Sequence, residues 1–150
     1  MSRVAPHGQA FNQTRQRYLA TELEVADTHW SRLRGLLGSS EADFMNGGGL
    51  WIRPCCGVHT LGMRFAIDVV YLDLSSTVIH IESNLQPWRF APVRVQARSV
   101  LELPPHTASS TGTLLGDRIV IKMRSGGSIA PGLPPGINPD DVNREKEIHA

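Results

Sequence analysis

The segment from Phe65 to Leu72 constrains the possible fold more than any other part of this sequence. Neighbouring side chains of a β-strand point to opposite faces of a sheet, and both alternating sets in this segment are apolar apart from one carboxylate, Asp68. Strands that are apolar on both faces are typically buried on both faces. The segment therefore predicts an interior strand of a sheet, with a carboxylate among apolar neighbours.

The apolar periodicity of the remaining sequence predicts further strands and one helix. A strand over 18–25 would place Leu23 and Val25 inside, and the turn Leu74-Ser75-Ser76 would join the interior strand to its partner in a hairpin. The other strands are expected at residues 50–52, 78–81, 99–103 and 118–123, with a flexible turn at 46–49 and a helix over 30–37 that ends at Gly38. We expect a mainly β (α+β) fold, a compact antiparallel β-sheet or barrel-like domain with one or two short helices.

The chain of 150 residues is long enough for one hydrophobic core and too short for two ordinary domains. Residues 1–16 are polar and lack apolar periodicity, so they are predicted to form a flexible N-terminal segment. Residues 17–124 are predicted to form the single domain. Residues 125–150 are rich in Pro and Gly and end in charged residues, which predicts a disordered tail.

Composition narrows the classes of function. Fifteen Lys and Arg against fourteen Asp and Glu leave a formal charge of +1, which provides no long-range field for nucleic acid or an acidic membrane. No apolar run reaches the length of a signal peptide or of a membrane-spanning helix. Two adjacent cysteines cannot form a disulfide framework. We therefore expect a soluble, cytoplasmic monomer that binds neither nucleic acid nor membranes.

The run from Cys56 to Asp73, CGVHTLGMRFAIDVVYLD, resembles the signature of the family called domain of unknown function 192 (DUF192). Three further pieces agree in order, namely RGLLG at 34–38, VLELP at 100–104 and GD at 116–117. The resemblance covers roughly Tyr18 to Met123. It implies a compact, mostly antiparallel β domain found in bacteria and archaea, and it implies no established activity.

The sequence departs from this family at two places. His106 stands where the family commonly has a glycine, and Leu74-Ser75-Ser76 replaces a hairpin turn that usually contains glycine. These departures concern the conformation of two loops.

Asp68 is the most informative residue, because a carboxylate buried among apolar side chains requires hydrogen-bond or charge partners. Arg64 lies on the same side of the strand, but four residues separate the two Cα atoms by roughly 13 Å. A backbone amide or a neighbouring strand could equally supply the partner. Two interpretations remain: a structural group that ties a loop to the sheet, or a ligand-facing acid at the mouth of a pocket.

The functional hypothesis is a non-catalytic binding module for a small polar ligand or a partner protein, without a cofactor. The ligand-binding residues would be His59, Met63, Arg64, Asp68 and Trp88, because the loop entering the interior strand and the loop around Trp88 could converge. Trp88 could instead be part of the core, and Arg89 could be an ordinary surface charge.

Two alternatives stay open. Cys56 and His59 could act as nucleophile and base in a thiol-dependent enzyme, oriented by Asp68 or Glu102, although catalysis is less favoured than binding. Glu102 lies between two leucines in sequence and is otherwise expected to be exposed. Cys56 and His59 are too few ligands for a structural metal site, so no metal is expected. The chain could also be a structural or assembly module tethered by its Pro-rich tail.

Overall fold

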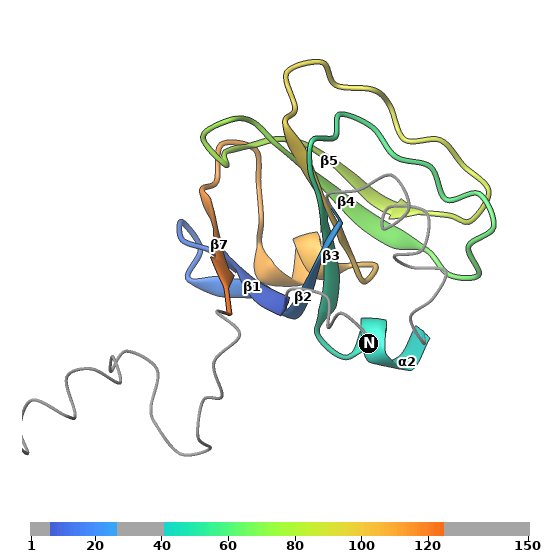
Figure 1. The fold of residues 1–150 in the computed structure, drawn as a ribbon, viewed down its shortest axis with the longest axis horizontal. Coiled ribbons are helices and arrows are strands. Elements are labelled where there is room, and N and C mark those ends of the chain that lie inside the picture. Colours follow the sequence, from blue (N-terminus) through green and yellow to red (C-terminus); the bar gives the residue numbers. More distant parts are fainter. Residues whose placement is uncertain (1–6, 27–40, 125–150) are drawn as a thin grey trace, which may run out of the picture.

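The computed structural model describes residues 7–26 and 41–124, which contain seven strands and two short helices (Figure 1). The strands are β1 (His7–Asn12), β2 (Arg17–Ala26), β3 (Gly48–Ile52), β4 (Ile67–Leu72), β5 (Val78–Leu85), β6 (Ser99–Leu103) and β7 (Ile119–Met123). The helices are α2 (Glu41–Met45) and α3 (Thr107–Thr111). The predicted helix over 30–37 and the predicted tail over 125–150 lie outside the described residues.

All seven strands belong to one sheet, in the order β5-β4-β6-β3-β2-β1-β7. Every neighbouring pair is antiparallel except β2 and β3. The sheet curls so that its two edge strands approach each other, and the amide N–H of Val78 donates to the carbonyl of Asp117 at 2.9 Å. The mainly β prediction is therefore confirmed.

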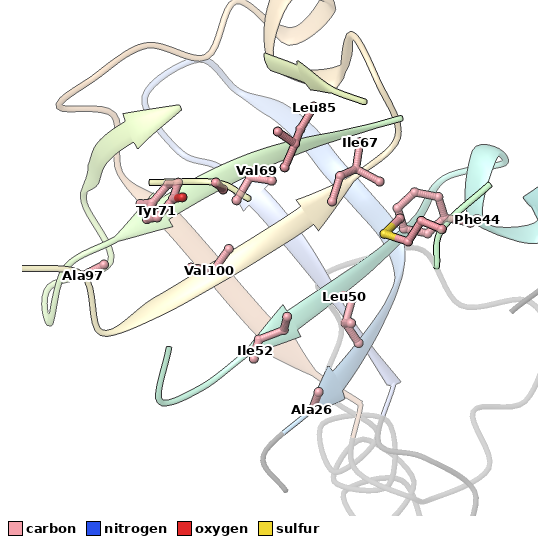
Figure 2. Packing of buried hydrophobic residues seen from close by; sticks show 12 residues of the cluster. Ala26, Phe44, Leu50, Ile52, Ile67, Val69, Tyr71, Leu85, Ala97 and Val100 are labelled. Carbon is pink, nitrogen blue, oxygen red and sulfur yellow. The ribbon is translucent and has the colours of Figure 1, made fainter. Parts of the chain in front are cut away.

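Strand β4 confirms the prediction of an interior strand, because all six of its residues are buried and it pairs with both β5 and β6. Its two faces belong to different hydrophobic cores. The inner core fills the curl of the sheet and includes Ala10, Leu19, Leu23, Val70, Leu72, Val78, Leu101, Leu103 and Ile119. The outer core covers the opposite face of β3, β6 and β4, and Figure 2 shows its residues Leu50, Ile52, Ile67, Val69, Tyr71 and Val100.

Strand β1 corrects the predicted flexible segment over residues 1–16, which is wrong for His7–Asn12. This strand lies between β2 and β7 and pairs with both. Its buried positions are Gly8, Ala10 and Asn12, a glycine, a small residue and a polar residue. The burial alternates regularly, but no alternation of large apolar side chains reveals it in the sequence.

The start of β3 corrects the predicted turn over 46–49, because Gly48 and Gly49 already belong to the strand. Both glycines are required by close packing. A Cβ atom on Gly48 would lie 2.7 Å from Phe44 Cα, and one on Gly49 would lie 2.9 Å from Ala20 Cβ. The glycine run therefore allows α2 and β2 to approach β3, and only Gly47, with φ +79°, has a turn conformation.

Both departures from the family pattern fall on backbone that glycine would favour. His106 has a φ of 70°, and Ser76 has a φ of 60° in the hairpin turn between β4 and β5. Residues with a Cβ atom rarely adopt this left-handed conformation. Both turns therefore carry some backbone strain.

Candidate functional site

Asp68 is completely buried, and its carboxylate accepts three backbone hydrogen bonds. The amides of Asn84 and His106 donate to Oδ1 at 2.9 and 3.1 Å, and the amide of Ala108 donates to Oδ2 at 2.9 Å. These bonds join β4 to the end of β5 and to the first turn of α3. Asp68 therefore has the hydrogen-bond partners that a buried carboxylate requires. All three are backbone amides of two other segments, which fits a structural role for the carboxylate.

Asp68 lies on the opposite face of β4 from the two loops that were expected to form the pocket. Side chains two residues apart share a face, so Asp68 lies on the inner side with Val70. Met63 and Ala91, one from each loop, pack instead into the outer core. The structure therefore does not bring Asp68 together with Arg64 or Trp88.

The two loops, residues 53–66 and 86–98, run side by side and form what we call the loop ribbon (Figure 1, in green and yellow). Backbone hydrogen bonds join the two loops along their length. The amide of Thr60 donates to Arg89 O at 2.8 Å, that of Ala91 to Val58 O at 2.9 Å, and that of Arg94 to Cys56 O at 2.8 Å. The loops carrying His59 and Trp88 therefore converge, which was the condition for the expected pocket.

Thr60 is the buried side chain that fixes one end of the ribbon. Its hydroxyl donates to Gln86 O at 2.6 Å and accepts from the amide of Arg89 at 2.9 Å. Its carbonyl accepts from the amide of Trp88 at 2.9 Å. These contacts hold Trp88 in the left-handed conformation, with φ 63°. Thr60 was not among the residues that the sequence predicted to bind a ligand.

The ribbon exposes large apolar side chains. Within eight residues, Trp88 is 65% exposed, Phe90 73%, Val93 65% and Val95 79%. The Phe90 ring meets the exposed His59 ring edge-on, with centroids 6.1 Å apart. Trp88 is therefore not part of the core. Clusters of exposed apolar residues on a folded protein indicate a surface that binds something.

The ribbon is also strongly basic. It contains five arginines, at positions 53, 64, 89, 94 and 98, and no Asp or Glu, although the formal charge of the whole chain is only +1. All five arginines are exposed. None of them takes part in a salt bridge with an acidic residue within residues 7–26 and 41–124.

Arg94 connects the ribbon to the sheet. Its guanidinium lies 3.4 Å from Nε2 of His80 on β5, and the same Nε2 lies 3.2 Å from Glu82 Oε2. Beneath them, the Tyr71 hydroxyl donates to Pro92 O at 2.7 Å. Burial, together with the nearby Glu82, raises the pKa of Tyr71 to about 12, so this hydroxyl remains a hydrogen-bond donor to the ribbon at neutral pH.

Glu102 was expected to be exposed, and this expectation is wrong. The side chain is only 5% exposed, and it lies directly opposite Leu50 on β3 and Val69 on β4, on the outer face of the sheet. Directly opposed residues share a face, so Glu102 lies in the layer between the sheet and the ribbon. Burial raises the pKa of Glu102 to about 8. No hydrogen bond to its carboxyl group is found within the described residues.

The other predicted residues divide between the outer core and the exposed surface of the ribbon. Met63 is 8% exposed and belongs to the outer core, whereas His59 and Arg64 are exposed on the ribbon. Cys56 is exposed too, but in the described part of the chain no hydrogen bond joins it to His59. Neither Asp68 nor Glu102 forms a hydrogen bond to His59 within the described residues, so no orienting acid for the proposed thiol chemistry is found among them.

No group of three or more His, Cys, Asp and Glu side chains is placed to hold a metal ion within residues 7–26 and 41–124. Among the helices of these residues, none has the length and hydropathy needed to cross a bilayer.

Comparisons with known proteins agree with the fold. A "UPF0127 protein" of Thermococcus sibiricus is 25% identical over 132 residues, covering 85% of this chain and 83% of the relative. The "UPF0127 protein PF1050" of Pyrococcus furiosus is 27% identical over 113 residues, covering 72% of this chain and 93% of that protein.

Two solved structures share the fold, each at 19% sequence identity. A protein of unknown function from Novosphingobium aromaticivorans has a TM-score of 0.63, and the match covers 77% of this chain and 83% of that chain. A putative transcription regulator from Sinorhizobium meliloti has a TM-score of 0.66, and the match covers 81% of this chain and 96% of that chain. The family described as DUF192, "Uncharacterized ACR", matches residues 10–121. The chain therefore belongs to the DUF192 family, whose function is uncharacterised.

Proposed function

We propose that this protein is a non-catalytic binding module that recognises a segment of a partner protein through its loop ribbon. The observation that carries the proposal is the exposure of Trp88, Phe90, Val93 and Val95 on a backbone that hydrogen bonds hold in place. Exposed aromatic side chains on a preorganised backbone lose little conformational freedom when a partner binds, and they supply much of the energy of protein interfaces.

A partner protein fits this surface better than a small polar ligand does. Small-molecule sites are concave and bury most of their ligand. Two of the five residues expected to line such a pocket, Met63 and Asp68, are buried in different layers. The three that remain, His59, Arg64 and Trp88, are exposed on the ribbon beside Phe90.

Selection from a displayed library of random linear peptides tests the proposal. The immobilised bait is either the unsubstituted protein or a double variant, Trp88→Asn with Phe90→Ser. Asn tolerates the left-handed conformation of position 88, so the first substitution removes the ring and not the turn. Leu74→Ser with Leu115→Ser serves as the matched control, because both leucines are exposed outside the ribbon.

We expect peptides to be enriched by the unsubstituted protein and by the control, and enrichment to fall at least about tenfold with the ribbon variant. Equal enrichment by all three proteins would place binding elsewhere and contradict the proposal. An absence of enriched peptides would contradict it as well.

A further inference from the structure

We infer that the partner segment is acidic and carries apolar side chains between its acidic residues. This inference rests on the proposed function, since it takes the loop ribbon as the binding surface and identifies the chemistry that the surface would accept. Two features of the ribbon support the inference: its positive charge and its exposed apolar side chains.

The ribbon concentrates positive charge. Five arginines and no acidic residue lie within residues 53–66 and 86–98, and the remainder of the chain offsets them to a total of +1. Glu82 is the acidic group that approaches the ribbon through His80 and Arg94. Arg64 and Arg89 form no salt bridge within the described part of the chain, so their guanidinium groups are available to carboxylates.

Apolar and basic side chains alternate along one loop of the ribbon. Trp88, Phe90, Val93 and Val95 are interleaved with Arg89, Arg94 and Arg98. A partner with only acidic residues would leave the apolar side chains exposed to water, and an entirely apolar partner would leave the arginines without counter-charges. A segment with both kinds of side chain satisfies both.

Single-stranded nucleic acid is the principal competing partner, because basic grooves with aromatic side chains bind it. Such sites stack successive bases on aromatic rings. The ribbon exposes three rings, on His59, Trp88 and Phe90, but the two exposed valines that follow have no π-face on which a base could stack. The valines favour the acidic, apolar polypeptide.

Fluorescence anisotropy with defined probes tests the inference. The first probe is a synthetic peptide that alternates Glu and Asp with Leu and Phe. Three comparison peptides replace the acids by Gln and Asn, replace the acids by Lys, or replace Leu and Phe by Ser. Two further probes are oligo(dT) and vesicles that contain phosphatidylglycerol.

We expect the acidic, apolar peptide to bind at least about tenfold more tightly than each comparison peptide, and more weakly as salt screens the charges. The double variant Arg64→Gln with Arg89→Gln should weaken binding about tenfold. Its control, Arg17→Gln with Arg118→Gln, makes the same change in net charge on exposed arginines outside the ribbon and should bind as the unsubstituted protein does.

The possible failures are distinguishable. Equal binding of the acidic and the Gln/Asn peptides, with loss of both in Trp88→Asn/Phe90→Ser, would overturn this inference and leave the proposed function intact. Tighter binding of oligo(dT) or vesicles than of any peptide, again dependent on the ribbon, would show that the partner is a nucleic acid or a membrane. That result would overturn both this inference and the proposed function. Binding that neither ribbon variant weakens would also overturn both.

Discussion

Asp68 on β4 and Glu102 on β6 are both almost completely buried, but they lie in different layers of the molecule. Asp68, in the inner layer, accepts three backbone amides that tie β4 to β5 and α3. Glu102, in the outer layer under the loop ribbon, lies between Leu50 and Val69, and its pKa is raised by burial to about 8.

The comparison shows that burial of a carboxyl group does not by itself define its role. Where amides converge on the group, as at Asp68, it acts as a structural connection. Where they do not, as at Glu102, the group holds its proton, and the layer around it becomes sensitive to pH.

The largest effect is expected for Asp68→Ala. The substitution leaves three amides in the interior without an acceptor, which should lower the free energy of unfolding by about 4 kcal/mol. Urea denaturation followed by circular dichroism measures this loss. If Asp68→Ala does not fold, Asp68→Asn, which retains one acceptor oxygen, should fold with a smaller loss. A loss below about 1 kcal/mol in either variant would contradict the structural role.

The second-largest effect is expected at Glu102, whose raised pKa should make the free energy of unfolding depend on pH. The folded protein holds this proton up to about pH 8, while the unfolded chain releases it near the ordinary value of 4.5. The folded state therefore binds more protons between these values, and its stability falls as pH rises, by about 3 to 4 kcal/mol between pH 5 and pH 8. Glu102→Gln should abolish this decline.

Denaturation at pH 5 and pH 8 compares the unsubstituted protein, Glu102→Gln and the control Glu41→Gln, which changes an exposed glutamate on α2. The control should behave as the unsubstituted protein does. The same decline in Glu102→Gln would show that other groups cause the pH dependence.

A smaller effect is expected for Thr60→Val, which has nearly the same shape but loses the hydroxyl. The amide of Arg89 and the carbonyl of Gln86 would lose their partner, which should lower stability by about 1 to 2 kcal/mol. The ribbon should loosen locally, so the Trp88 and Arg89 amides should exchange faster by NMR. Thr60→Ser retains the hydroxyl and should preserve their protection; faster exchange in both variants would exclude the hydroxyl as the cause.

The smallest effect should be a gain in stability. His106→Gly relieves the left-handed conformation at φ 70° while the backbone amide that donates to Asp68 remains. We expect the free energy of unfolding to rise by about 0.5 kcal/mol, because the relief of strain exceeds the extra entropy of glycine in the unfolded chain. Thermal unfolding detects the change, and a lower midpoint would show that the His106 side chain stabilises the loop.

The sequence predicted the strands that carry large apolar side chains and missed the one that does not. Strand β4 and its hairpin partner follow from alternation alone. Strand β1 buries Gly8, Ala10 and Asn12, and its position depends on pairing with β2 and β7, segments that are distant in sequence or irregular in register. Such pairing is a tertiary property, and composition alone does not reveal it.

The candidate site was predicted in part. The convergence of the loops carrying His59 and Trp88 was only a condition of the expected pocket, and Asp68 was placed with them because its face of the sheet was not known. Glu102 was expected in solvent because a strand with one polar position is ordinarily half exposed. In the structure the side chain is buried on the outer face of the sheet, opposite Leu50 and Val69. The absence of acidic residues from residues 53–66 and 86–98 was visible in the sequence and would have indicated the ribbon.

The pairing of β1 with β7 has a practical consequence for engineering. Gly8 lies opposite Met123, and the amide of Arg124 donates to the carbonyl of His7 at 2.8 Å. The polypeptide therefore enters and leaves the sheet at one point, on the other side of the molecule from the ribbon (Figure 1). A circular permutant that links position 124 to position 7 and opens the chain at Ser75, in the exposed hairpin turn, would retain all seven strands and the ribbon.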